Sequence, residues 1–167
     1  MKKWISIIAI MLVVVFAAGC TDSSPKTYTG NGISFQYPAD WSTDYKSDFQ
    51  DSLGSSGTVL VSLGKDNAGI AVAKMDLGTA QVSASKFASA FKSSASSGGL
   101  TFVSEKTVTV AGNTGYEKVF KYTENSSSMY ASCIFFENSN DLYLLMIGTS
   151  DNDQKTVDMI LNSFKFT

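Results

Sequence analysis

Few side chains in this sequence could do chemistry, and their types exclude the common catalytic arrangements. The chain has no His, so the commonest general base and the commonest metal ligand are both missing. Its two Cys are Cys20, at the end of an apolar stretch, and Cys133, in an apolar segment without His or Arg nearby to lower the thiol pKa. A Ser nucleophile would need Lys or a carboxylate as its base, and no Gly-x-Ser-x-Gly elbow accompanies one. We therefore expect neither an enzyme nor a cofactor.

Carboxylates are the remaining candidates for a metal site. Asp40, Asp44, Asp48 and Asp51 recur at short intervals and could form an oxygen-ligand patch for Ca²⁺, which needs no His. The residue order of an EF-hand loop is missing, however, and an acidic face in contact with water explains the same pattern. We expect no metal and retain these four Asp as weak candidates. Either Asp151 or Asp153 is interpreted as the capping residue of a following helix.

The N-terminus has the features of an export signal. Lys2 and Lys3 precede an apolar run over residues 4–19, which is shorter than the roughly 18 or more residues of a membrane-spanning helix. Small residues then lead directly into Cys20, and this resembles the lipobox, at which prokaryotic lipoproteins are cleaved and acylated on the new N-terminal Cys. Two acyl chains on one residue, such as palmitate, anchor a protein stably where one chain gives only marginal binding. Ala17 stands where a lipobox usually has Leu, so ordinary signal-peptidase cleavage is the alternative.

Length and charge indicate one acidic domain. Removal of residues 1–19 leaves 148 of the 167 residues, which suits a single domain with an ordinary core. Two of the 13 basic residues leave with the signal, so 11 face 15 acidic ones and the mature net charge is −4. All basic residues are Lys, without a basic cluster, so we expect no nucleic-acid partner. With Cys20 acylated, Cys133 has no intramolecular disulfide partner, and stability must come from packing.

Hydrophobic periodicity predicts a sheet covered by helices. We divide the chain into a lipoprotein signal peptide at residues 1–19, a polar tether at 20–30 and a domain at 31–167. Strands are predicted at 33–37, at 58–63 and 68–76 as a hairpin, and at 101–110, 116–123, 129–137 and 142–149 as an antiparallel meander. The segment 142–147 is apolar on both faces, which places it centrally. Helices are predicted at about 81–96 and near the C-terminus, and residues 40–53 are ambiguous between helix and turn.

Both ends of the predicted domain resemble the PsbP-like family. The start, Gly32-Ile-Ser-Phe-Gln-Tyr-Pro-Ala-Asp-Trp41, is similar to the aromatic-Tyr-Pro-x-x-Trp segment of these domains, and the close, Asn162-Ser-Phe-Lys-Phe166, is similar to their Ser-Phe-x-Phe strand. The resemblance implies an α+β fold, an antiparallel sheet between helices in a PsbP-like α/β/α sandwich. It identifies no ligand, and no functional residue can be carried over.

The function that follows is an expectation from the anchor, the resemblance and the missing chemistry. We expect a non-catalytic lipoprotein at the extracytoplasmic face of the cell membrane, held there by Cys20 and serving as an accessory or assembly factor for an envelope protein partner. The alternative is a module that binds a small solute or Ca²⁺. The oligomeric state is left open.

Overall fold

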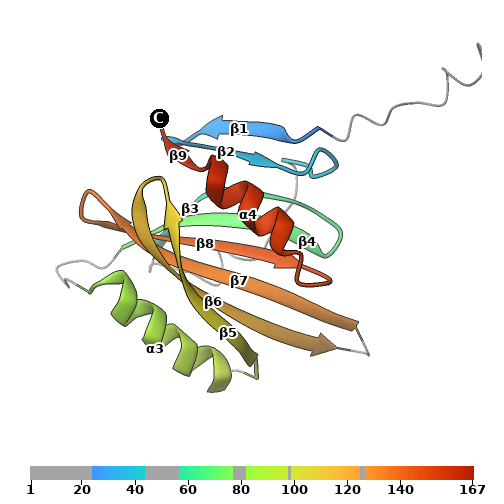
Figure 1. The fold of residues 1–167 in the computed structure, drawn as a ribbon, viewed down its shortest axis with the longest axis vertical. Helices are drawn as coiled ribbons and strands as arrows, with labels where there is room; N and C mark the ends of the chain where they lie inside the picture. The colour runs from blue at the N-terminus through green and yellow to red at the C-terminus, as the bar shows by residue number, and fades with distance from the viewer. Residues whose placement is uncertain (1–23, 44–56, 77–81, 98, 125–126) are drawn as a thin grey trace, which may run out of the picture.

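The computed structural model describes residues 24–43, 57–76, 82–97, 99–124 and 127–167 (Figure 1). Within these ranges the chain forms two sheets and two helices. In chain order the elements are β1 (Lys26–Gly30), β2 (Ile33–Tyr37), β3 (Gly57–Lys65), β4 (Ala68–Met75), α3 (Ala84–Ser97), β5 (Thr101–Val110), β6 (Asn113–Glu124), β7 (Ser127–Asn138), β8 (Asp141–Thr149), α4 (Gln154–Ser163) and β9 (Lys165–Phe166).

The larger sheet has six antiparallel strands in the order β3-β4-β8-β7-β6-β5. The hairpin β3–β4 and the meander β5–β8 follow the predicted arrangement. β8 joins the two parts of the sheet by pairing with β4. β8 therefore lies inside the sheet with both faces covered, as its apolar sequence predicted. Leu144 on one face and Leu145 on the other are both buried, which places the core on both sides of this strand.

Helix α3 covers one face of the large sheet, over β5, β6 and β7 (Figure 1). Its apolar stripe meets aromatic side chains of the sheet. The ring of Phe91 lies 5.1 Å from that of Phe135 and 5.8 Å from that of Phe120, and Phe87 lies 5.5 Å from Phe135. Each buried aromatic removes a large apolar area from water, so this contact is what fixes α3 to the sheet.

Helix α4 and a small sheet of order β1-β2-β9 lie on the opposite face (Figure 1). Val157, Ile160 and Leu161 form the buried side of α4, as the i, i+3, i+4 spacing predicted. Phe164, at the end of the helix, stacks on Phe35 of β2 at 6.0 Å. The sheet is therefore enclosed between α3 on one side and α4 with the small sheet on the other, which confirms the predicted α+β class.

The start of each helix is stabilised by a carboxylate. Asp153 Oδ1 accepts hydrogen bonds from the backbone N–H groups of Lys155 and Thr156 at the start of α4. At the start of α3, the backbone N–H of Ala84 donates to Glu137 Oε1 from β7. α3 begins at Ala84, three residues after the approximate start that the sequence predicts.

One predicted boundary is wrong. Residues 26–30 were assigned to the polar tether, but they form β1, which pairs along its whole length with β2, from Lys26↔Tyr37 to Gly30↔Ile33. Most β1 side chains are exposed at the edge of the small sheet, so the apolar alternation that marks a half-buried strand is missing. Neither described helix is long and apolar enough to cross a membrane.

Candidate functional site

The predicted acidic patch is described only at Asp40. Asp44, Asp48 and Asp51 lie outside the described residues, as does Cys20. Asp40 follows β2, and its Oδ2 lies 3.2 Å from the Lys65 Nζ at the end of β3; both side chains are more than half exposed. An ion pair between two turns accounts for this carboxylate. Within the described ranges, no three His, Cys, Asp or Glu side chains come together as a possible metal site.

The second cysteine is a core residue. Cys133 lies on β7, is 1% exposed, and belongs to the apolar layer under α3. Burial raises the pKa of its thiol to about 12, with a smaller contribution from the nearby negative charge of Glu117. The thiolate is the nucleophilic form, so a thiol with this pKa is protonated and unreactive at neutral pH.

Asp153 is the residue that caps α4, which selects it from the two predicted candidates. Besides the two backbone N–H groups, its carboxylate accepts a hydrogen bond from the Thr156 hydroxyl at 2.6 Å. That hydroxyl is the main reason that the pKa of Asp153 is lowered, and the two backbone donors add to the effect. The carboxylate is thus ionised and has structural partners.

The described Ser and Lys residues with Ser-x-x-Lys spacing have structural contacts of their own. Ser83 and Lys86 stand three residues apart at the start of α3, where the Ser83 Oγ accepts the backbone N–H of Lys86 at 3.5 Å. Ser62 and Lys65 have the same spacing, but the Lys65 ammonium pairs with Asp40. Ser89 and Lys92 also have it, and the Lys92 ammonium pairs with Glu105. The Ser-x-x-Lys spacing alone makes no nucleophile and base pair here.

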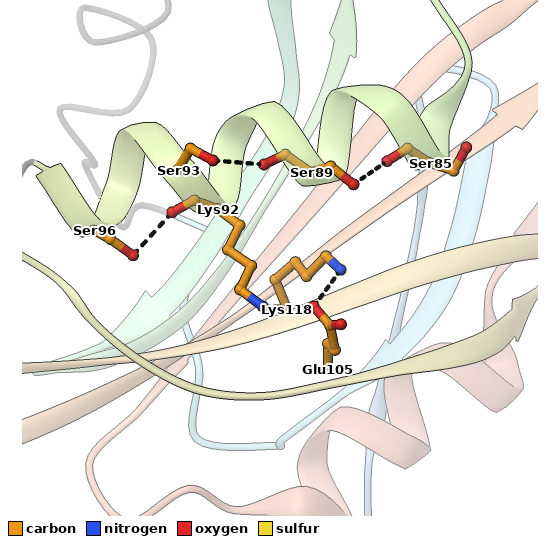
Figure 2. Close-up of polar contacts among 7 residues, drawn as sticks. All are labelled: Ser85, Ser89, Lys92, Ser93, Ser96, Glu105 and Lys118. Atoms are coloured by element: carbon orange, nitrogen blue, oxygen red, sulfur yellow. Dashed lines mark hydrogen bonds and ion pairs between the residues drawn. The ribbon is translucent and has the colours of Figure 1, made fainter.

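The Ser-rich side of α3 binds its own backbone (Figure 2). The hydroxyl of Ser89 donates to the carbonyl of Ser85 at 2.9 Å, that of Ser93 to Ser89 at 3.3 Å, and that of Ser96 to Lys92 at 3.0 Å. Each hydroxyl uses its donor on the preceding helical turn. These serines therefore act locally in the helix.

A cluster of three charged side chains joins α3 to β5 and β6 (Figure 2). Glu105 Oε2 lies 2.6 Å from Lys118 Nζ and 3.1 Å from Lys92 Nζ. The two ammonium groups, Lys118 first and then Lys92, lower the pKa of Glu105. Lys92 Nζ also lies 3.6 Å from the centroid of the Phe102 ring, within cation–π range. A carboxylate held ionised by two cations is a poor general base, so this lysine cluster serves to dock α3 and leaves one net positive charge on the surface.

Glu117 is a buried carboxylate that the sequence pattern did not single out. It lies on β6, is 0% exposed, and neither of its carboxylate oxygens has a hydrogen-bond partner among the described residues. The Nζ of Lys106, opposite it on β5, lies 3.3 Å from Oε2 as an ion pair, and the Lys106 side chain is 46% exposed. The alternation of side chains along a strand could have predicted its burial. Glu117 shares its sheet face with Gly115 and Val119, which are both buried.

Comparisons with known proteins converge on one family and one fold. The model of the family described as PsbP-like protein matches residues 20–166. Cyanobacterial PsbP (CyanoP) from Synechocystis sp. PCC 6803 superposes with a TM-score of 0.59 at 16% identity, covering 90% of this chain and 96% of that one. LpqN, involved in cell envelope biogenesis of Mycobacterium tuberculosis, superposes with a TM-score of 0.52 at 13% identity, covering 86% of this chain and 90% of that one.

A third structure shares the fold within a larger chain. A Bacteroides thetaiotaomicron protein superposes with a TM-score of 0.55 at 11% identity; the match covers 87% of this chain and 48% of the other. This chain thus spans about half the length of that protein. No curated protein sequence matches it. At these identities the structural matches establish the fold, and the sequence match carries the family.

Proposed function

The chain belongs to the PsbP-like protein family, and on this premise we propose that it is a non-catalytic accessory factor of the cell envelope. In this proposal a lipid on Cys20 holds the domain at the extracytoplasmic face of the membrane, where it binds an envelope protein partner. The observation that carries the proposal is the family match from Cys20 to Phe166. It begins at the residue where the sequence predicts cleavage and acylation, directly after the apolar run.

The contacts of the chemically capable residues support a non-catalytic role. Cys133 is a protonated core thiol, Asp153 caps a helix, and Glu105 is held by two lysines. A general base needs an accessible proton acceptor whose pKa is near the pH at which the enzyme works. A nucleophile needs a base within hydrogen-bond reach. None of these three side chains meets those conditions.

The description of one structural neighbour agrees with this assignment. LpqN is described as involved in cell envelope biogenesis, and it shares the fold over most of both chains. We extend to this chain only the setting, an envelope location with a supporting role. The identity of the partner is left to experiment.

In-cell photo-crosslinking tests the partner. The large apolar side chains most exposed in the described residues are Val103, on β5, and Tyr122, on β6, at 43% and 45%. Tyr is enriched in protein interfaces, so a photoreactive residue at Tyr122 is the first probe, with Lys165 on β9 as a matched exposed-strand control. We expect one protein to be captured reproducibly from the Tyr122 site and not from the control. Equal capture at both sites, or none from any exposed position of the acylated protein, refutes partner binding.

A further inference from the structure

The chain between the proposed lipid and the folded domain is very short. Cys20 and Ser24, the first described residue, are four residues apart. An extended chain covers at most about 3.6 Å per residue, so Ser24 lies within about 14 Å of the acylated residue. β1 then begins only two residues later, at Lys26. The finding that residues 26–30 belong to β1 is what makes this tether too short to let the domain tumble freely.

Three segments meet where β1 begins. Lys26 pairs with Tyr37, so the start of β1 lies beside the end of β2. The chain then turns, with the Trp41 backbone N–H donating to the Pro38 carbonyl, and Asp40 reaches Lys65 at the turn that joins β3 to β4. We call this end of the domain the tether end, made of residues 24–26, 38–40 and 65–68. In Figure 1 the blue start of β1 and the β3–β4 turn lie at the same side of the molecule.

The opposite end of the large sheet lies far from the point where the tether enters the domain. The pair Gly69↔Gly148 marks the tether end of β4 and β8, and the pair Met75↔Leu142 marks their other end. The six residue steps from one pair to the other span about 20 Å at 3.4 Å per step. The β7–β8 turn lies further out still, at Ser139 and Asn140. With Ser24 held within about 14 Å of the anchored residue, this turn meets the membrane only when the domain lies along the surface, and not when it stands on the tether end.

The exposed side chains of the tether end suit a polar surface. They are Ser24, Pro25, Lys26, Asp40, Lys65, Asp66 and Asn67, of which only Pro25 is apolar. The two strongly exposed large apolar side chains of the described residues, on β5 and β6, lie outside this set, at the opposite edge of the large sheet from β3. Strand register places them level with the C-terminal end of β8, so they lie to the side of the tether end. Burying the charged members of this set in hydrocarbon would remove their hydration at a large cost in free energy, whereas headgroups and their water can solvate them.

From reach and chemistry together, we propose that the tether end faces the lipid headgroup layer without entering the hydrocarbon, and that the β7–β8 and β5–β6 turns point away from the membrane. This inference rests on the proposed lipid at Cys20 and adds an orientation to it. It also means that a protein partner must be met at the sides or the far end of the domain.

Depth-dependent fluorescence quenching tests the orientation in the acylated protein. A single introduced Cys is the only reactive thiol, because Cys20 is acylated and Cys133 is buried with a raised pKa. Asn67→Cys, in the β3–β4 turn, reports on the tether end. Thr114→Cys reports on the far end: it is exposed and follows the β5–β6 turn, and the next residue aligns across the sheet through Gly115↔Phe136 and Phe136↔Tyr143. Both variants are labelled with a maleimide fluorophore and reconstituted into phosphatidylethanolamine–phosphatidylglycerol vesicles.

The vesicles carry a nitroxide either on the lipid headgroup or deep in the acyl chain. We expect the headgroup quencher to reduce the Asn67→Cys signal several-fold more than the Thr114→Cys signal, and the deep quencher to affect neither. Equal quenching of both labels, stronger quenching of Thr114→Cys, or quenching of Asn67→Cys by the deep nitroxide would overturn the orientation. Flotation of the same vesicles separates the two proposals, because protein that fails to float refutes the lipid anchor itself. Unchanged thermal unfolding verifies that each variant is folded.

Discussion

The buried carboxylate of Glu117 leads to the sharpest stability prediction. It is fully buried, accepts no hydrogen bond from the described residues, and has Lys106 Nζ 3.3 Å away as an ion-pair partner. Changing Lys106 to Met keeps an unbranched apolar stem over the strand but removes the ammonium. The carboxylate is then left buried without its countercharge, which is the costly way to break such a pair.

The geometry sets the size of the effect. At 3.3 Å and an effective dielectric constant of about 20, the Coulomb attraction is about 5 kcal/mol. Because the Lys106 side chain is 46% exposed, water screens the pair, and we discount the attraction to about 2 kcal/mol. Replacing both residues, with Lys106→Met and Glu117→Met together, also removes the desolvation cost of the carboxylate, so the double variant should regain wild-type stability or exceed it.

Urea unfolding of the mature protein measures this directly. In a chain that starts at Cys20, Trp41, which is 6% exposed, is the single Trp and serves as the fluorescence probe. Lys165→Met, at an exposed lysine of β9, is the matched control and should change the free energy of unfolding by less than about 0.5 kcal/mol. If Lys106→Met costs no more than this control, or if the double variant is less stable than Lys106→Met alone, the reasoning about Glu117 is wrong.

Three further predictions concern single residues. Asp153→Ala should lower the free energy of unfolding by about 1 kcal/mol at pH 7, since it removes the α4 cap. Because the folded-state pKa of Asp153 is lowered, its contribution is complete above the unfolded pKa of about 3.9 and is lost as pH falls through the folded value, so wild type and variant should converge in urea titrations at low pH. Cys133 should not react with Ellman's reagent at pH 8 until urea unfolds the chain; immediate reaction would contradict its burial. Cys20→Ala should move the protein from the membrane fraction to the medium, and persistence in the membrane would refute the lipid anchor.

The helices and the central strand could be predicted because their signals are local. Val157, Ile160 and Leu161 recur at helical spacing behind a capping Asp, and the apolar run of β8 required burial on both faces. β1 could not be recognised, because an exposed edge strand shows no alternation and is defined by its hydrogen bonds to β2.

The polar contacts depended on arrangement in space. Cys133 was correctly interpreted from its apolar neighbours, and its burial supplied the reason. Glu105 meets Lys118 through strand register and Lys92 through the docking of α3, each 13 residues away in the sequence. Asp40 meets Lys65, 25 residues away, because two turns are adjacent. Sequence spacing carries no information about such pairs.

The amino-acid order alone was sufficient for the strand and helix pattern of the core and for the lack of a His-based site, because each of these is a property of composition or of short-range periodicity. Tertiary structure decided which charges are paired, that Glu117 is buried, and that the domain begins at β1 only six residues after Cys20. These outcomes follow from strand register and from the packing of α3 and α4 on opposite faces of the sheet. Both depend on contacts between segments far apart in the chain, which no local pattern encodes.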